Sequence, residues 1–203
     1  MSPRPRLDHV RRPELLAAAA AVIRRRGIAS ARVADVAEEA GVSAASVLYY
    51  FASKAELLKE ALTYAEERYY EELHEGLAGR DSARDRLALL ATWGTGEGDY
   101  DAVLWMELWA LALRDPELAA TRAELDRRWR GTIAEVVRYG QERGEFGPAD
   151  PDELALLLAA LLDGLAVQIA LRDEDVTPAR VRGLALELAE RELGSRLYEE
   201  ARC

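Results

Sequence analysis

The sequence predicts an all-α fold, in which a three-helix head is joined by one long helix to a larger helical bundle. Apolar residues recur at the three- and four-residue spacing of a helix face along most of the 203-residue chain. Prolines precede these periodic segments and glycines follow them, as is typical of helix ends. No two alternating apolar segments are joined by a hairpin turn, so the sequence indicates no sheet.

The N-terminal segment is expected to be an arm followed by a first helix. The first twelve residues are rich in proline and arginine, and they lie either along nucleic acid or in solvent. A helix is predicted over residues 13–26, since Pro13 suits a first helical turn and Gly27 suits the position after the last. Arginines at 24–26 fall in the final turn, where cations interact favourably with the helix dipole.

The next two helices are short and are separated by a tight turn. In residues 33–40 apolar side chains fall at i, i+3, i+4 and i+7, which is one face of a helix. Gly41 supplies the left-handed conformation that ends this helix, and Ser43 caps the next one over residues 44–50. Such a pair forms a helix-turn-helix unit, whose second helix enters the DNA major groove.

A long helix follows at once and links the two halves of the chain. Ser53 and Glu56 have the spacing of a capping box, which predicts a helix start at Lys54. The pattern continues to Leu77, so the helix spans about 36 Å at 1.5 Å per residue. Because it begins in the head and ends in the second half, it is a lever between them.

Five further helices complete the predicted bundle. Ser82, Asp150 and Thr177 precede helical periodicity and are typical N-cap residues. Gly131 and Gly140 fall inside the third of the five, which leaves a break within it open. The helices are expected over residues 83–93, 100–114, 116–143, 151–171 and 178–200.

Residues 32–58, RVADVAEEAGVSAASVLYYFASKAELL, resemble the helix-turn-helix segment of the TetR family of transcriptional regulators. Spacing and residue type agree across the segment, including AGVS at the turn and FASK before the long helix. Arg32 stands where the family has a capping threonine, so either Ser30 caps that helix or its cap is poor. Leu48 replaces a phosphate-contacting tyrosine of the family, and Tyr50 replaces a histidine.

Candidate DNA contacts are the exposed hydroxyl, phenol and cationic side chains of this segment, which are groups that bond phosphate oxygens, together with two adjoining alanines. Val42, Val47 and Phe51 are expected to point inward and to hold the recognition helix in place. The predicted contacts are Arg32, Ser43, Ala44, Ala45, Ser46, Tyr49, Tyr50 and Lys54.

The charge distribution divides the chain into a basic head and an acidic body. The net charge is −10. Residues 1–59 carry ten Arg or Lys and six Asp or Glu, whereas residues 60–203 carry seventeen and thirty-one. Neutralising phosphate needs only a local basic surface. We therefore assign 1–59 to an arm and DNA-binding domain, and 60–203 to a helical ligand-binding and dimerisation domain.

The helix near residues 154–171 is apolar on nearly every face, which is typical of a helix buried on all sides. A second subunit is the expected source of this extra burial, with ordinary core packing as the alternative. The last helix carries a matching stripe, and the resemblance implies dimerisation through the last two helices. The predicted homodimer interface, a four-helix contact across a two-fold axis, contains Leu158, Leu161, Leu165, Leu184 and Leu188.

The second half also predicts a pocket for a small-molecule effector. Residues 93–109 and 160–170 resemble the choline-responsive branch of the family, and acidic with aromatic groups favour an organic cation. Trp105 and Trp109 share one helix face, whereas Glu107 lies off the other side. A carboxylate inside an apolar helix needs a partner, a ligand or a solvated cavity, unless Asp163 points across the dimer interface. The tryptophans fit an ordinary core as well as a ligand site. The candidate lining is Trp93, Trp105, Trp109, Trp129, Tyr139, Asp163 and Gln168.

The sequence predicts no catalytic or metal site and no cofactor. His9 and His74 are far apart, and the acidic pairs at 38–39, 66–67 and 71–72 are interpreted as solvated helix faces. Cys203 is the single cysteine, and the first sixteen residues lack the apolar core of a signal peptide. No run of about twenty apolar residues lacks charge, so no membrane helix is expected. We therefore expect a cytoplasmic protein that is not an enzyme.

These observations predict a homodimeric, ligand-responsive transcriptional regulator, most simply a repressor. Each head would read half of a palindromic double-stranded DNA operator. The effector would favour a head spacing that no longer matches major grooves about 34 Å apart. Two other classes remain open, namely a DNA-binding protein that regulates no gene and a helical sensor or interaction protein that no longer binds DNA.

Overall fold

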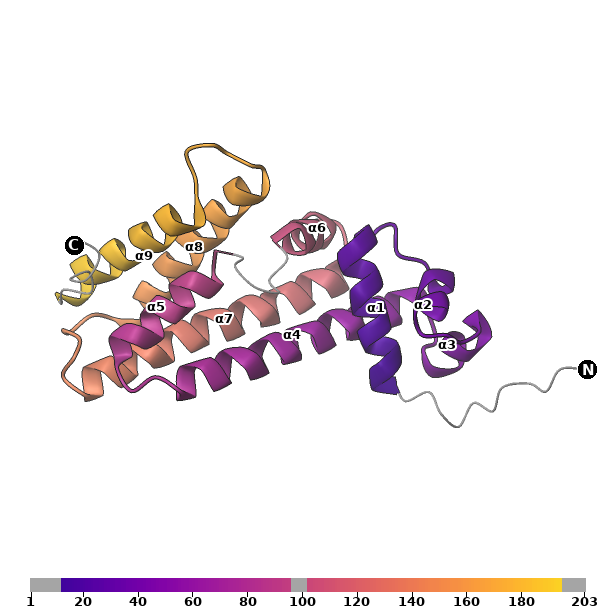
Figure 1. The fold of residues 1–203 in the computed structure, drawn as a ribbon, viewed down its shortest axis with the longest axis horizontal. Coiled ribbons are helices and arrows are strands. Elements are labelled where there is room, and N and C mark those ends of the chain that lie inside the picture. Colours follow the sequence, from indigo (N-terminus) through magenta and orange to yellow (C-terminus); the bar gives the residue numbers. More distant parts are fainter. Residues whose placement is uncertain (1–11, 96–101, 195–203) are drawn as a thin grey trace, which may run out of the picture.

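The computed structural model describes residues 12–95 and 102–194, and within these ranges every regular element is a helix, as the sequence predicts. Three short helices lie at one end of a long one, and a bundle covers the other end (Figure 1). The helices are α1 (Arg12–Arg26), α2 (Val33–Glu39), α3 (Ala44–Tyr50), α4 (Lys54–Ala78), α5 (Ala83–Trp93), α6 (Ala102–Ala112), α7 (Pro116–Glu142), α8 (Pro151–Ala170) and α9 (Pro178–Leu193).

Local capping groups fix the helix-turn-helix unit, α2 and α3, where the sequence predicts it. Ser43 Oγ accepts from the Ser46 amide at 3.1 Å and starts α3. Gly41, between the two helices, has a φ of +68°, the left-handed conformation that glycine tolerates. Ser53 Oγ accepts from the Glu56 amide at 3.1 Å, and Glu56 accepts from the amide just before Ser53 at 2.5 Å. The Ser53 cap therefore starts α4 as predicted, although Glu56 bonds the amide before the cap rather than that of Ser53 itself.

The start of α2 shows how the chain manages without the family's capping threonine. Arg32 occupies the N-cap position, and its side chain makes no capping bond. The Asp35 carboxylate instead accepts from the Arg32 amide at 3.1 Å and pairs with Arg26 at 2.9 Å. Ser30 therefore does not cap α2, and Asp35 takes over part of the missing threonine's role.

The head has its own apolar core, which α4 and α6 complete. Leu15, Val22, Val36, Val47 and Phe51 are fully buried there, with Leu57 of α4 and Leu108 of α6 packed against them. Val47 and Phe51 thus hold the recognition helix α3 from behind, as predicted. Because the first half of α4 belongs to this core and its second half to the body, a domain boundary at residue 59 stays a prediction.

Arg12 is not part of the predicted arm but has a structural role in the head. It begins α1, and its guanidinium donates to the Tyr50 carbonyl at 2.9 Å and lies 4.6 Å from the Phe51 ring centroid. It also pairs with Glu60 of α4 at 2.5 Å. Arg12 therefore ties α1 to the end of α3 and to α4. The rest of the predicted arm lies outside the described residues.

The body is built around α7, which runs unbroken through both of its glycines. A Cβ at Gly140 would lie 2.1 Å from the Phe146 ring, so glycine is needed there to let that ring pack on the helix. Helices α5, α8 and α9 and the second half of α4 share one core with α7. The helix bounds fall within two residues of the prediction, except at the last helix.

The predicted end of the last helix at residue 200 is wrong. Gly194 follows α9 in a left-handed conformation, with a φ of 60°, and stops the helix after Leu193. Residues 195–203, like the predicted start of α6 at residue 100, lie outside the described part of the chain.

Candidate functional site

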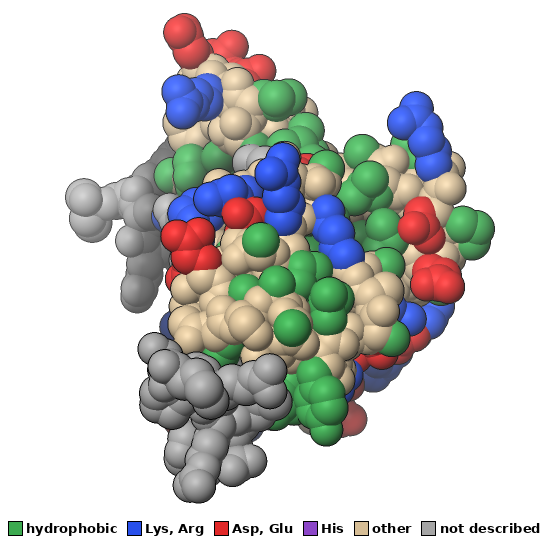
Figure 2. Space-filling model, turned by 90° about the vertical axis from the view of Figure 1, so that its right-hand side faces the viewer, with side chains coloured by type: hydrophobic (Ala, Val, Ile, Leu, Met, Phe, Trp, Pro, Cys, Tyr) green, Lys and Arg blue, Asp and Glu red, His purple; other side chains and the backbone are tan. Residues whose placement is uncertain are grey.

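The recognition helix α3 presents an exposed face at the end of the head. Tyr49 is 77 % exposed and Leu48 is 51 % exposed, although both are large side chains that a protein core would accept. Figure 2, which looks onto this end of the molecule, shows hydrophobic side chains gathered on the face with Lys and Arg side chains beside them. Large exposed apolar groups bordered by cations are typical of a binding surface.

The other predicted DNA contacts surround this face. Ser43, Ala44 and Ala45 are exposed at the start of α3, where the small side chains allow close approach. Arg32 is exposed at the start of α2. Lys54 is exposed at the start of α4, and its Nζ donates to the Ala29 carbonyl at 3.3 Å.

Two predicted contacts are less available than the rest. Ser46 is half-buried, and its hydroxyl lies 2.8 Å from that of Ser43, so the two share one hydrogen bond. Tyr50 is half-buried against the head core, with its ring edge-on to Tyr49 at 5.4 Å between centroids. Leu48, which the sequence does not place among the contacts, is more exposed than either.

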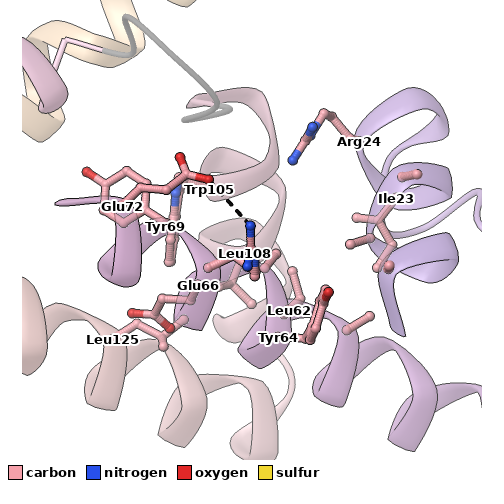
Figure 3. A pocket seen from close by; sticks show the side chains of 16 residues that line it. Ile23, Arg24, Leu62, Tyr64, Glu66, Tyr69, Glu72, Trp105, Leu108 and Leu125 are labelled. Atoms are coloured by element: carbon pink, nitrogen blue, oxygen red, sulfur yellow. Dashed lines mark ion pairs between the residues drawn. The ribbon is translucent and has the colours of Figure 1, made fainter. Parts of the chain in front are cut away.

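A cavity of about 270 Å³ lies where the head meets the body. Its walls come from α1, α4, α6 and α7 (Figure 3). Apolar residues make up most of its lining, including Ala17, Ala20 and Ala21 of α1. Arg24 of α1 and Tyr64 of α4 contribute polar groups.

A second, smaller cavity of about 40 Å³ adjoins the first inside the body. The two share Glu66, Tyr69, Trp105 and Leu125. The small cavity combines carboxylates with aromatic rings from α4, α6, α7 and α8, an arrangement that suits an organic cation. Its full lining is Glu66, Tyr69, Tyr70, Gly94, Trp105, Trp109, Leu125, Asp126, Trp129 and Asp163.

Two carboxylates of the small cavity have raised pKa values, so they take up a proton more easily than an exposed carboxylate does. Burial raises the pKa of Glu66 to about 7, and Arg128 offsets part of this. Burial and the nearby Asp126 raise the pKa of Asp163 to about 6. Neither Glu66 nor Asp163 forms an ion pair among the described residues, whereas Asp126 pairs with Arg122. A bound cation would supply the missing counter-charge.

The structure brings together four of the seven predicted pocket residues: Trp105, Trp109, Trp129 and Asp163. Trp93 packs on Tyr69 with 4.9 Å between ring centroids but does not line the cavity.

The remaining predicted pocket residues lie elsewhere. Tyr139 donates to the Asp81 carbonyl at 2.8 Å and stacks under Arg86, so its ring is engaged at the far end of α7. Gln168 is exposed on α8. Helix periodicity could not place either residue, since it does not show which face of a helix its neighbours cover.

The interpretation of Glu66 as part of a solvated helix face is wrong. The pair at 66–67 was expected to be a solvated face, but Glu66 is only 6 % exposed. The sequence holds a signal for this, because Glu66 continues the buried stripe formed by Leu62, Tyr70 and Leu73 along α4. A carboxylate within an otherwise apolar stripe is typical of a functional group.

The indole Nε1 of Trp109 is a buried donor without a hydrogen-bond partner in the described part of the chain. Trp109 lines the small cavity. Because buried N–H groups are normally paired, a ligand oxygen next to the cationic centre would satisfy it.

Helix α6 connects the small cavity to the head. Trp105 and Trp109 face the cavity, while Glu107, on another face of the helix, accepts from the Ile28 amide at 2.5 Å. The contact is close, since a Cβ at Gly27 would lie 2.3 Å from the Glu107 carboxylate. Gly27 and Ile28 form the turn between α1 and α2. Glu107, which the sequence left outside the pocket, is therefore a direct link from α6 to the DNA-binding unit.

The outward face of α8 and α9 differs from the predicted interface at one position. Leu158 is only 3 % exposed because it packs into the core of its own subunit. Leu161, Leu165 and Leu188 are half-buried, and Leu184 is exposed. The outward stripe of α8 also contains Leu157, Ala160 and Gly164.

An exposed helix-turn-helix joined to a helical body with a cavity suited to a ligand is typical of a ligand-responsive, DNA-binding transcriptional regulator. Family models agree: one for bacterial regulatory proteins of the tetR family matches residues 15–61, and one for the C-terminal part of BetI-type transcriptional repressors matches residues 80–194. The chain belongs to the TetR family and carries a BetI-type C-terminal domain. Because these proteins are regulators, the chain is not an enzyme.

Similar proteins cover nearly the whole chain. The regulator BetI 2 of Chromohalobacter salexigens is 29 % identical, over 90 % of this chain and 88 % of that protein. A putative TetR-family regulator from Rhodococcus sp. has 31 % identity and a TM-score of 0.77, covering 90 % and 97 % of the two chains. A putative regulator from Saccharomonospora viridis, solved in complex with choline, has 30 % identity and a TM-score of 0.76, covering 89 % and 95 %.

Proposed function

We propose that this regulator is a homodimeric, cytoplasmic repressor that an organic cation of the choline type releases from a palindromic operator. The observation that carries the proposal is the small cavity, in which Glu66 and Asp163 face three tryptophans and two tyrosines. The structurally similar protein from Saccharomonospora viridis was solved with choline, which supports the same ligand class here.

The chemistry of the cavity favours a quaternary ammonium over a primary amine. A quaternary ammonium cannot donate N–H bonds, so it is held by ring faces and by nearby negative charge, and the cavity supplies both. The free Nε1–H of Trp109 is matched by an oxygen close to the cation, such as the hydroxyl of an amino alcohol.

Dimerisation is supported by the outward face of α8. This helix is long and apolar enough to cross a membrane by length and composition, but only 33 % of its most apolar stretch is buried within the subunit. Much of its apolar surface is therefore left for a partner to cover. Leu157 of α8 is 47 % exposed, and a Cβ at Gly164 would meet no atom of the described residues within 4 Å. A second copy packed on this face would bury the leucines and use the space at Gly164 for close helix contact.

Release of DNA would follow from a change at α6. The cation contacts Trp105 and Trp109 on one face of this helix, and Glu107 on another holds the turn between α1 and α2. A ligand that rotates or displaces α6 therefore shifts the head relative to the body. In a dimer this changes the spacing of the two recognition helices, which must match successive major grooves.

A mobility-shift assay on the DNA flanking the chain's own gene tests this function. The free protein should give a specific shift at modest salt, and choline should remove it. A carboxylic acid of similar size should leave it in place. If no specific shift forms, or if the acid releases DNA as well as choline does, the proposed function is wrong.

A further inference from the structure

We propose that the two adjoining cavities form one bipartite site, and that the effector is a quaternary ammonium carrying an apolar chain. This inference rests on the proposed cation site and names the other half of the ligand. The ammonium group occupies the small cavity, and the chain extends past Trp105 and Leu125 into the large one.

The two cavities share a wall and differ in chemistry. Glu66, Tyr69, Trp105 and Leu125 line both, so a ligand bound in one lies against the residues that bound the other. The small cavity adds carboxylates and indoles. The large one adds mainly alanine, leucine and isoleucine side chains, namely Ala17, Ala20, Ala21, Ile23, Leu62 and Leu108 among others.

The alanines at residues 17–21 face two different environments. Ala18 and Ala19 are buried in the core of the head, whereas Ala17, Ala20 and Ala21 line the large cavity. The short side chains of these three alanines leave space between α1 and the facing helices α4 and α6, and Arg24 of α1 borders this space (Figure 3).

Polar and charged side chains also line the large cavity. They are Arg24, Tyr64, Arg68 and Glu72, and Arg68 pairs with Glu72 at 3.9 Å (Figure 3). The two cavities together therefore combine a part with carboxylates and aromatic rings with a part whose lining is mainly apolar. A cation with a chain of several carbons matches both parts, whereas choline matches only the first.

The large cavity brings the ligand into contact with the head itself. Ala17, Ala20, Ala21, Ile23 and Arg24 belong to α1, the first helix of the DNA-binding unit. No residue of α1 lines the small cavity. A chain-bearing cation thus acts on α1 directly as well as through α6, so it should release DNA more effectively than choline at equal occupancy.

Calorimetric titration of the full-length protein with choline and with butyl-, hexyl- and octyltrimethylammonium tests the proposal. The dissociation constant should fall about fourfold for each methylene that enters the large cavity. The Ala20→Leu variant should weaken binding of the octyl compound at least tenfold and leave choline unchanged. Ala78→Leu, at an exposed position at the end of α4, is the matched control and should behave as the parent.

The outcomes separate this proposal from the one on which it rests. If choline binds but longer chains bring no gain, or if Ala20→Leu affects choline and the octyl compound alike, the bipartite site is refuted and the cation site stands. If octanol binds as tightly as octyltrimethylammonium, the coupling of chain to cation is refuted. If no quaternary ammonium binds at all, the proposed effector class fails, and the bipartite site fails with it.

Discussion

Replacing Glu107 by glutamine should make the regulator more sensitive to its effector. The Glu107 carboxylate accepts from the Ile28 amide at 2.5 Å, a hydrogen bond to a charged group. Such bonds contribute about 1.5–3 kcal/mol, and a half-exposed one lies at the low end. A glutamine keeps an acceptor but loses the charge, so roughly 1 kcal/mol of the link is lost in each subunit.

The size of the effect follows from a two-state description of the link. If the ligand-bound state breaks the contact, weakening it by about 1 kcal/mol favours that state about fivefold per subunit. The choline concentration that half-releases DNA should therefore fall by about fivefold, with a smaller loss of DNA affinity. Gly27→Ala should act in the same direction, because its Cβ would displace the Glu107 carboxylate.

Fluorescence anisotropy of labelled operator DNA, titrated with choline, measures this directly. Glu135→Gln removes an exposed carboxylate from α7 and serves as the control, with an unchanged midpoint. A Glu107→Gln midpoint that equals the parental one, or that lies at a higher choline concentration, would refute the role given to α6.

Four further outcomes are expected. Choline affinity measured by calorimetry should weaken as the pH falls from 8 to 5, because Glu66 and Asp163, with pKa values of about 7 and 6, become protonated and lose their negative charge. A pH-independent affinity would contradict their role. The melting temperature of the free protein should change in the opposite sense and fall as the pH rises through 6–7, since raised carboxyl pKa values favour the folded state only while the groups stay protonated. Trp109→Phe should reduce the preference for choline over tetramethylammonium by about fivefold, the value of one hydrogen bond, and a preference that survives would exclude the Nε1 contact. Leu157→Arg should weaken the dimer at least about 30-fold in sedimentation equilibrium, because it places a charge in an apolar contact, and an intact dimer would move the interface elsewhere.

The helix-turn-helix unit is predictable from sequence because its determinants are local. Ser43 and Ser53 cap helices through atoms only three residues away, and Gly41 acts on its own backbone. None of these features depends on which distant segment packs nearby. The same locality explains why the bounds of α3 and α5 agree with the prediction.

The cavity is less predictable because it depends on which helix covers which. The stripe along α4 indicates that Glu66 faces inward, but no local pattern reveals that residues of α6, α7 and α8 meet it around a cavity. Leu158 lies in a helix that is apolar on every side, so periodicity cannot separate its inward face from its outward one. Glu107 was set aside because it does not face the tryptophans, yet that placement is what lets it reach the head.

Release of operator DNA by choline in the parent protein and in Asp163→Asn is the most direct measurement of whether the small cavity controls the head. Asparagine keeps the size of the side chain and removes its charge. Anisotropy should show that choline releases DNA from the parent, that the variant binds DNA with equal affinity, and that its release needs at least tenfold more choline. Equal choline midpoints for the two proteins would show that DNA binding is controlled from another site.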